Sequence, residues 1–355
     1  MKPLSVSVAM AAYNGAAYIG EQLSDLAAQT VLPAEVVICD DGSADSTLAQ
    51  VEQFAAGAPF PVRIYRNADR LGYRANFMKC AAICRSDLIA FCDQDDRWLP
   101  EKLATMARPF DNPEVLLAFH GAELIGPDGR RLGPLTAMPR LPGLSPRLSG
   151  SPWDFALGFT QIFRKWLCQW DELWPQSCDQ NTDDQPLAHD QWYFFLAGSL
   201  GCIANVPEPL VRYRQHGANL FGWVPGAKGF RTRVRRRVAV ASMAMERRAR
   251  SARQRAIILN LMAEKLEEPF RQRAQEGAKV YSDLSIRCEQ RATIYHARTF
   301  GGRVGGLASL LRSRGYGPGP WRFGPMALGM DLLVGLPALA DRVVRGRLIK
   351  RSPSP

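Results

Sequence analysis

Several protein classes are excluded by what the 355-residue sequence lacks. Its eight cysteines form no double pair of the kind that binds zinc, and Cys80 and Cys84 share one helical face, which makes them poor disulfide partners. We therefore expect buried, reduced thiols, as in cytosolic proteins. Residues 1–3 run directly into the first predicted strand, so we also expect no signal peptide and a cytoplasmic location.

Long apolar segments are also missing. The best candidate, residues 323–340, is interrupted by Asp331 and Pro337 and is marginal for a helix that spans a membrane. No nucleic-acid-binding motif accompanies the basic residues, so we expect no nucleic-acid partner. The remaining composition, with 46% hydrophobic and 22% charged residues, is ordinary for a globular protein of more than one domain.

The most informative feature present is a group of carboxylates that follows a short apolar run. Residues 88–91 predict a buried strand, and Asp93, Asp95 and Asp96 come directly after it. Anions this close together repel one another unless a cation joins them. Carboxylate oxygens favour Mg²⁺ or Mn²⁺, ions that usually hold a substrate diphosphate as well. The alternative is a solvated turn in which an aspartate favours the start of the next helix.

Strands and helices alternate along the first part of the chain. Apolar runs predict four strands, which cover residues 4–12, 35–39, 61–65 and 88–92. Helix-length segments lie between them, so the pattern fits βαβ units and predicts an α/β fold with a mostly parallel sheet. Ligands of such sheets bind outside the carboxyl ends of the strands. Five side chains fall at those ends: Tyr13, Asp40, Asp41, Asp93 and Asp95.

An ordered set of motifs runs through residues 1–222. The motifs are Ala-Tyr-Asn-Gly at 12–15, Asp-Asp-Gly-Ser-Ala-Asp-Ser-Thr at 40–47, Asp-Gln-Asp-Asp at 93–96, Ala-Leu-Gly-Phe-Thr at 156–160, His-Asp-Gln-Trp at 189–192 and Tyr-Arg-Gln-His-Gly at 213–217. Together they resemble the family 2 inverting glycosyltransferases, which have a GT-A fold, a Rossmann-like sheet flanked by helices. The last two motifs resemble the branch that contains rhamnosyltransferases of surface polysaccharide synthesis.

On the donor side, the resemblance implies a site for a nucleotide diphosphate sugar. Tyr13 would stack near the nucleobase, although it could instead cap the sheet edge. Asp40 or Asp41 would accept a base N–H, and the sequence does not decide between them. Arg74 would approach the diphosphate.

The resemblance also implies a metal site for Mg²⁺ or Mn²⁺. Asp95 would bind the ion directly, and His216 would be a second ligand. Asp93 would contact the ribose or a metal-bound water. The alternative for His216 is an ordinary turn histidine beside Gly217.

On the acceptor side, the resemblance places a general base at Asp190. One base and one metal-held leaving group would give a single displacement that inverts the anomeric carbon. Gly158, His189 and Trp192 would lie near the acceptor. His189 stands where the family often has an acidic residue, so it would contact the acceptor or support Asp190 electrostatically. Asp190 could alternatively be only a helix cap.

Charge is distributed unevenly along the chain. Residues 1–225 carry 18 basic and 25 acidic side chains, whereas residues 226–355 carry 27 basic and 9 acidic ones. We expect residues 1–225 to form the GT-A catalytic domain. Its parts would be a nucleotide-sugar half at 1–125, a mobile acceptor-site loop at 126–152, rich in Gly and Pro, and an acceptor half at 153–225.

The basic half predicts two helices and a tail. Small and apolar residues recur at heptad spacing at Val238, Ala241, Met245, Ala249, Ala252, Ala256, Leu259, Ala263 and Leu266. Pro269 should end this helix, and a second one should complete a basic hairpin at 226–300. An amphipathic basic tail would follow at 301–355.

The tail suggests an anionic membrane surface as a partner. Apolar residues that would face lipid lie beside many arginines; they are Trp321, Phe323, Leu332, Leu333 and Leu336. Such a protein would be peripheral on the cytoplasmic face of a membrane, and its acceptor would be a saccharide or a lipid-linked molecule. The alternatives are a solvated hairpin with a packed tail or a homodimer through the C-terminal helices.

Two other function classes remain open. A nucleotidyltransferase would also pair carboxylates with Mg²⁺, but it needs a basic glycine-rich loop early in the chain, and residues 11–15 contain no Lys or Arg. An inactive GT-A domain could serve as a membrane scaffold, but Asp93, Asp95, Asp190 and His216 are all present.

Overall fold

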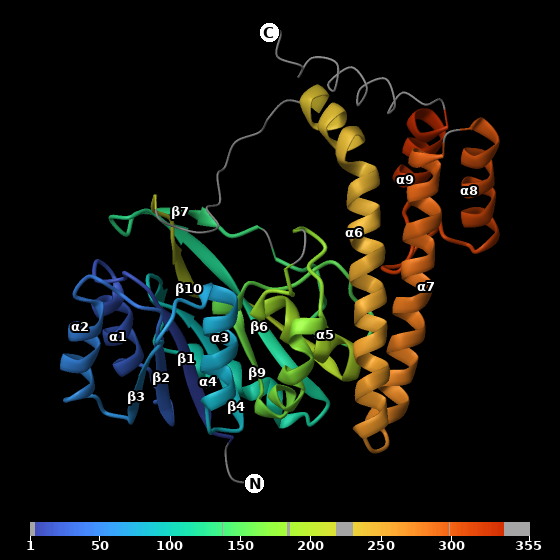
Figure 1. Cartoon of the computed structure of the whole chain (residues 1–355). Helices are drawn as coiled ribbons and strands as arrows, with labels where there is room; N and C mark the ends of the chain where they lie inside the picture. Colours follow the sequence, from blue (N-terminus) through green and yellow to red (C-terminus); the bar gives the residue numbers. More distant parts are fainter. Residues whose placement is uncertain (1–3, 137, 183–184, 218–229, 298, 337–355) are drawn as a thin grey trace. The chain divides into compact units, whose positions relative to one another are not determined.

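Figure 1 shows the computed structural model of the chain, which describes residues 4–136, 138–182, 185–217, 230–297 and 299–336. For residues 230–242 and 334 only the backbone is described. The chain divides into two compact units. Unit 1 comprises residues 1–174 and 187–223, and unit 2 comprises residues 175–186 and 224–355.

Unit 1 is built on one mixed sheet with the strand order β3-β2-β1-β4-β9-β6-β10-β5. The strands are β1 (Val6–Ala12), β2 (Glu35–Asp40), β3 (Val62–Arg66), β4 (Leu88–Asp93), β5 (Arg97–Trp98), β6 (Val115–Ile125), β7 (Arg131–Pro134), β8 (Leu144–Ser145), β9 (Gln161–Arg164) and β10 (Cys202–Arg214). The first four strands in this order are parallel. β9 is antiparallel to both β4 and β6, whereas β6 and β10 are parallel, so the sheet is mixed and β9 interrupts the parallel order that we predicted.

Helices cover both faces of this sheet, which confirms the α/β class. They are α1 (Ile19–Ala27), α2 (Thr47–Ala55), α3 (Gly72–Ile83), α4 (Lys102–Ala107) and α5 (His189–Leu200), with short turns η1 (Arg108–Asp111), η2 (Gly158–Thr160) and η3 (Lys165–Gln176). The side chains of a strand alternate between the two faces, and this alternation decides which helix each strand residue meets.

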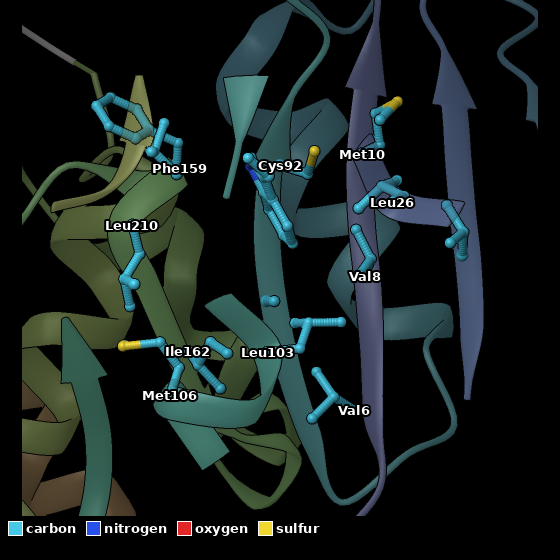
Figure 2. Packing of buried hydrophobic residues seen from close by; sticks show 14 of the residues in the cluster. Val6, Val8, Met10, Leu26, Cys92, Leu103, Met106, Phe159, Ile162 and Leu210 are labelled. Atoms are coloured by element: carbon cyan, nitrogen blue, oxygen red, sulfur yellow. The ribbon is translucent and has the colours of Figure 1, made fainter. Parts of the chain in front are cut away.

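The two faces of β4 have different neighbours. Leu88, Ala90 and Cys92 point into the core beneath α1 and α4, where they meet residues such as Leu26 and Leu103 (Figure 2). On the other face, Phe91 packs edge-on against Phe77 of α3. It also meets the ring of His189 at the start of α5, with the ring centroids 4.7 Å apart. Because Asp93 has the same parity as Phe91, the carboxyl end of β4 opens toward α3 and α5.

The segment 126–152, which we expected to be a loop, contains two short strands. β7 is antiparallel to β6, and β8 is antiparallel to β10. Both pairings add main-chain hydrogen bonds at the end of the sheet that lies far from β1. The glycine and proline content of this segment does not reveal these pairings, because the partner strands lie elsewhere in the sequence.

Unit 2 contains the predicted helical hairpin, formed by α6 (Phe230–Lys265) and α7 (Phe270–His296), which pack side by side (Figure 1). The heptad residues from Met245 to Leu266 are all buried. α7 contributes its own buried small residues, among them Ala274 and Ala278. The chain therefore covers this seam itself, which removes the reason to expect a homodimer through it. The heptad positions 238 and 241 lie among the side chains outside the described set.

The tail of unit 2 forms α8 (Phe300–Arg312), α9 (Pro325–Met330) and the π-helical turn η4 (Asp331–Gly335). One residue that we expected to face lipid packs inside the unit: Phe323 is 9% exposed beneath the guanidinium of Arg291, so its predicted lipid contact is wrong. The ring of Trp321 lies edge-on to Tyr281 at 4.9 Å and is partly exposed. Leu332 and Leu333 are exposed. The part of the predicted basic tail that follows residue 336 lies outside the described residues.

Asp331 is the buried polar centre of unit 2. It is 0% exposed and accepts hydrogen bonds from the guanidinium of Arg291 and from the hydroxyls of Tyr295 and Tyr316. These contacts join α7 to η4, because a buried carboxylate needs such partners.

In the described part of the chain, no helix is both long and apolar enough to cross a membrane. All eight cysteines are free thiols.

Candidate active site

The residues predicted at the strand ends converge on one rim. In the register of the sheet, Ala12 pairs with Asp40 on β2 and Ala11 pairs with Asp93 on β4. Tyr13 follows β1 directly, so it lies between the ends of these two neighbouring strands. The strands themselves are mostly apolar and buried, and the polar residues follow at the points where the strands end. The rim formed by these ends is therefore polar.

Tyr13 is held by a residue that the sequence did not suggest. Gln94 accepts a hydrogen bond from the backbone N–H of Tyr13 at 2.9 Å, and its amide donates to the carbonyl of Tyr13 at 2.9 Å. A Cβ on Gly15 would lie 2.1 Å from the Gln94 side chain, so only glycine fits there. The Tyr13 ring lies 3.9 Å below the guanidinium of Arg70. It is therefore a partly exposed aromatic surface with a cation over one face.

Asp40 and Asp41 have different partners. Asp40 accepts hydrogen bonds from the backbone of Gly42 and Ser43, so it fixes the turn after β2. Asp41 accepts from the Asn67 side chain and from the N–H groups of Leu71 and Gly72, at 2.7 to 2.8 Å. It therefore joins this turn to the start of α3. Both carboxylates are buried.

Arg74 projects from the first turn of α3 toward the start of α5. Burial is the main cause of the pKa shifts of His189 and Asp190, which are lowered and raised respectively. The positive charge of Arg74 acts on both groups, so it lies near both side chains. The guanidinium therefore lies on the same face of the sheet as Asp93. That position is compatible with an approach to a diphosphate.

Asp93 lies in a crowded anionic region. Burial, together with the negative charges of Asp95 and Asp190, raises its pKa to about 8. The positive charge of Lys102 has the opposite effect and lowers the pKa of Asp93. Because Asp190 is 97 residues away in the sequence, this coupling shows that the fold brings the predicted donor and acceptor sides together.

Asp95 and His216 are in direct contact. The Asp95 carboxylate lies 2.9 Å from Nε2 of His216, and the imidazole packs against the ring of Tyr18 with centroids 4.9 Å apart. The structure thus joins the two predicted metal ligands, which are 121 residues apart in the sequence. Among the described residues, no three His, Cys, Asp or Glu side chains gather closely enough to hold a metal ion without further ligands.

A divalent cation fits this donor set. One carboxylate oxygen and one imidazole nitrogen suit Mg²⁺ or Mn²⁺, which usually complete their coordination shell with waters and substrate phosphates. The mutual repulsion of Asp93 and Asp95 is the structural feature that such an ion would relieve.

Arg214 organises the acidic loop and was not assigned a role from the sequence. It is 3% exposed. Its backbone N–H donates to Asp96, and Nε donates to the carbonyl of Asp95 at 2.9 Å. The two terminal nitrogens donate to the carbonyl of Pro127 and to the carboxylate of Glu21. One side chain therefore fixes the loop of Asp95 and Asp96, α1 and the end of β6 together.

Asp190 lies at the start of α5 and is 7% exposed. One carboxylate oxygen accepts from the N–H of Gly158 at 3.2 Å, and the other accepts from the N–H of Gln191 at 2.8 Å. Burial nevertheless raises its pKa to about 7, since these bonds and the charge of Arg74 offset only part of that penalty. A carboxylate with a pKa near neutrality is suited to take up a proton.

The turn that supports Asp190 is held from two sides. The Gln161 amide donates to the carbonyls of Ala156 and Asp190. The fully buried Lys102 donates to the carbonyl of Phe159 at 2.6 Å and lies 3.4 Å from the centre of the Trp98 ring. Neither residue was predicted. Each stands in a sequence context typical of ordinary packing, so no local pattern could have revealed it.

The predicted acceptor-side residues are mostly buried. His189 stacks on Phe77 at 4.1 Å, and burial lowers its pKa to about 3, so it is neutral and gives Asp190 no cationic support. A Cβ on Gly158 would lie 2.6 Å from His189, which explains the glycine. Trp192 is 0% exposed and donates to Asp171, so it supports the site from within the protein rather than contacting an acceptor.

Comparison with known proteins shows which family the first part of the chain resembles. The model described as glycosyl transferase family 2 matches residues 7–168, the part that carries Tyr13, Asp40, Asp41, Asp93 and Asp95. This part of the chain is similar to the family 2 glycosyltransferases. An uncharacterized glycosyltransferase of Nostoc sp. is 26% identical over 311 residues, which cover 83% of this chain and 84% of the relative.

Other relatives match shorter parts of the chain. An uncharacterized protein of Mycobacterium tuberculosis is 29% identical over 61% of this chain, and the chain spans about 60% of that relative's length. The dTDP-rhamnosyl transferase RfbG of Shigella flexneri is 35% identical over 98 residues, which are 26% of this chain and 34% of RfbG.

The fold is also found among solved structures. The crystal structure of S. aureus TarS 1–349 in complex with UDP-GlcNAc has a TM-score of 0.50 and covers 89% of this chain and 93% of that one. The two are 16% identical, so the likeness concerns the fold. It agrees with the GT-A fold that the motifs predicted.

Replacing Arg214 by lysine should test its role in the acidic loop. Lysine keeps the charge but cannot bond Asp95, Pro127 and Glu21 at once. We expect kcat/KM to fall about 10-fold or more, because misplacing an active-site group by a small distance is costly. Arg212→Lys is the matched control, since Arg212 is exposed on the same strand. Equal activity of the two variants would contradict the role of Arg214.

Proposed function

We propose that this protein is a glycosyltransferase that moves a sugar from a nucleotide diphosphate donor to a hydroxyl of a saccharide or lipid-linked acceptor, with inversion at the anomeric carbon. The observation that carries the proposal is the position of Asp190. It is a buried carboxylate with a pKa of about 7, and its charge is felt by Asp93 at the donor rim. A base beside a donor site is the arrangement that a single displacement requires.

Asp190 performs the proton transfer in this proposal. Its ionised carboxylate accepts the proton of the acceptor hydroxyl as the oxygen attacks the anomeric carbon. The N–H groups of Gly158 and Gln191 hold the two oxygens in place, so little reorganisation accompanies the reaction. General base catalysis of this kind contributes about 10²- to 10⁴-fold in rate.

The leaving diphosphate would be held at the opposite side of the sugar. Asp95 and His216 would bind Mg²⁺ or Mn²⁺, and Arg74 would add a positive charge from α3. A divalent ion at this place supplies a Lewis acid for the charge that grows on the departing phosphate. Tyr13 and the turn that carries Asp40 and Asp41 would receive the nucleoside.

For the donor, we favour a deoxythymidine-diphosphate sugar, with rhamnose as the first candidate. The identity with RfbG over 98 residues and the motif at residues 213–217 support this choice, together with a role in surface polysaccharide synthesis. TarS shows that this fold holds a nucleotide sugar. A panel of nucleotide sugars, scored by thermal stabilisation of the protein, tests the choice. Stabilisation by uridine or guanosine diphosphate sugars alone would replace it.

We also place the protein at an anionic membrane surface. A lipid-linked acceptor would be reached there, and the excess of basic residues in 226–355 favours binding to anionic lipid.

The pH dependence of kcat/KM should reveal Asp190. Only the ionised carboxylate accepts a proton, so the rate should rise as pH increases through about 7 and level off above it. Asp190→Asn should lower kcat about 100-fold or more with little change in donor binding, because Asn keeps the size of the side chain and one acceptor oxygen but is no base. Asp111→Asn, an exposed change in unit 1, is the control. A nearly active Asp190→Asn protein would refute the catalytic assignment.

The metal assignment makes a separate prediction. Excess chelator should abolish transfer, and added Mn²⁺ or Mg²⁺ should restore it. Asp95→Ala should abolish transfer without unfolding the protein, since Asp95 is only partly buried. Calorimetry should show that Mn²⁺ strengthens nucleoside diphosphate binding to the natural protein and not to Asp95→Ala. Full activity in excess chelator would exclude the metal from the reaction.

A further inference from the structure

The last helices of unit 2 present large apolar side chains to solvent. On α8, Phe300 is 68% exposed, Val304 is 40% exposed and Leu311 is 50% exposed. These positions are four and eleven residues apart, so they lie on one face of the helix. The adjacent side of α8 is buried and carries Arg303, Gly306 and Leu310. Leu307, at the border between the two sides, is also buried. The helix is therefore anchored along one side and exposes apolar residues beside it.

The helical segment that follows adds to this exposure. Met326 of α9 is 79% exposed, and Leu333 of η4 is 73% exposed. Single exposed apolar residues are normal on protein surfaces, but three large ones on one face of α8 indicate a binding surface. We call Phe300, Val304, Leu311, Met326 and Leu333 the apolar residues of the tail.

The charge of this region has one sign. From residue 290 to residue 330 the sequence contains six arginines and no aspartate or glutamate. Three of these arginines are exposed: Arg312, Arg314 and Arg322. The next carboxylate, Asp331, is 0% exposed and paired with Arg291. The surface of residues 299–336 therefore combines apolar side chains with positive charge and shows no exposed carboxylate.

We propose that this surface docks on an anionic lipid bilayer, with the apolar residues of the tail entering the headgroup region and the arginines contacting lipid phosphates. A helix that combines an apolar face with positive charge has this property. A second copy of the chain is disfavoured because it would bring like charges together, and a nucleic acid would leave the aliphatic side chains unburied. The inference rests on the membrane association proposed above and names the residues that perform it.

The test is co-sedimentation of the full chain with vesicles of phosphatidylcholine, with and without phosphatidylglycerol. We expect binding to the anionic vesicles, weakened by salt because salt screens surface charge. Phe300→Ser combined with Leu311→Ser should weaken binding about 10-fold or more, since apolar burial contributes to the affinity. Neutralising Arg312, Arg314 and Arg322 to Gln should weaken it about 5-fold per arginine.

A matched control distinguishes binding by this surface from nonspecific hydrophobic adsorption to vesicles. Val31 and Leu32 of unit 1 are 53% and 43% exposed, so Val31→Ser combined with Leu32→Ser removes similar apolar area elsewhere. This variant should bind as the natural protein does. Circular dichroism should show that all variants are folded, because every changed side chain is exposed. Asp190→Asn should bind vesicles normally, so a failure of the catalytic proposal would leave this one intact.

Three results would overturn the proposal. The first is no binding of the full chain to anionic vesicles. The second is unchanged binding by the Phe300→Ser and Leu311→Ser protein. The third is a change of oligomeric state in analytical ultracentrifugation caused by the same two substitutions, which would show that the surface contacts a second copy of the chain.

Discussion

Negative charge concentrated at the carboxyl end of β4 is the constraint on which the rest of unit 1 depends. Burial raises the pKa values of Asp93 and Asp190 to about 8 and about 7, which reduces their mutual repulsion near neutral pH. Arg214 adds a positive charge at the loop that carries Asp95. Lys102 lies nearby, and burial lowers its own pKa to about 7. The carboxylates at the end of β4 therefore repel one another, and a bound divalent cation that also carries a diphosphate would relieve this repulsion.

The acidic groups are held by backbone donors rather than by flexible side chains alone. Asp41 is bound by the N–H groups at the start of α3, and Asp190 by those of Gly158 and Gln191. Backbone donors cannot rotate away, so the carboxylates keep their orientation at small entropic cost. This explains why the turns of the site carry glycine: Gly72 has a φ of 77°, which other residues rarely adopt.

The sequence predicted the rim well because local patterns define it. Strand alternation placed Tyr13, Asp40 and Asp93 at neighbouring strand ends, and the heptad seam placed the α6–α7 hairpin. Contacts over long sequence distances were not predictable. Arg214 meets Asp95 across 119 residues, and no periodicity indicates such a partner.

Amphipathic patterns also failed in an instructive way. They identify an apolar face but not whether the chain itself covers that face. Phe323 was therefore assigned to lipid although it packs beneath Arg291. A family motif has a similar limit, since Trp192 was assigned to the acceptor side by such a motif although it is buried. The same limit hid the exposed face of α8, since its apolar residues looked no different from those of a core helix.

Gln94 links two functions that are usually altered separately. It stands between Asp93 and Asp95 in the chain, and its side chain grips the backbone of Tyr13 on the neighbouring strand. Any redesign of base preference that shifts Tyr13 will pull on the segment between the two aspartates. Laboratory evolution toward a new nucleotide should consequently proceed through changes that keep the two hydrogen bonds between Gln94 and the Tyr13 backbone. Changes that break them should require compensating substitutions around the proposed metal ligands.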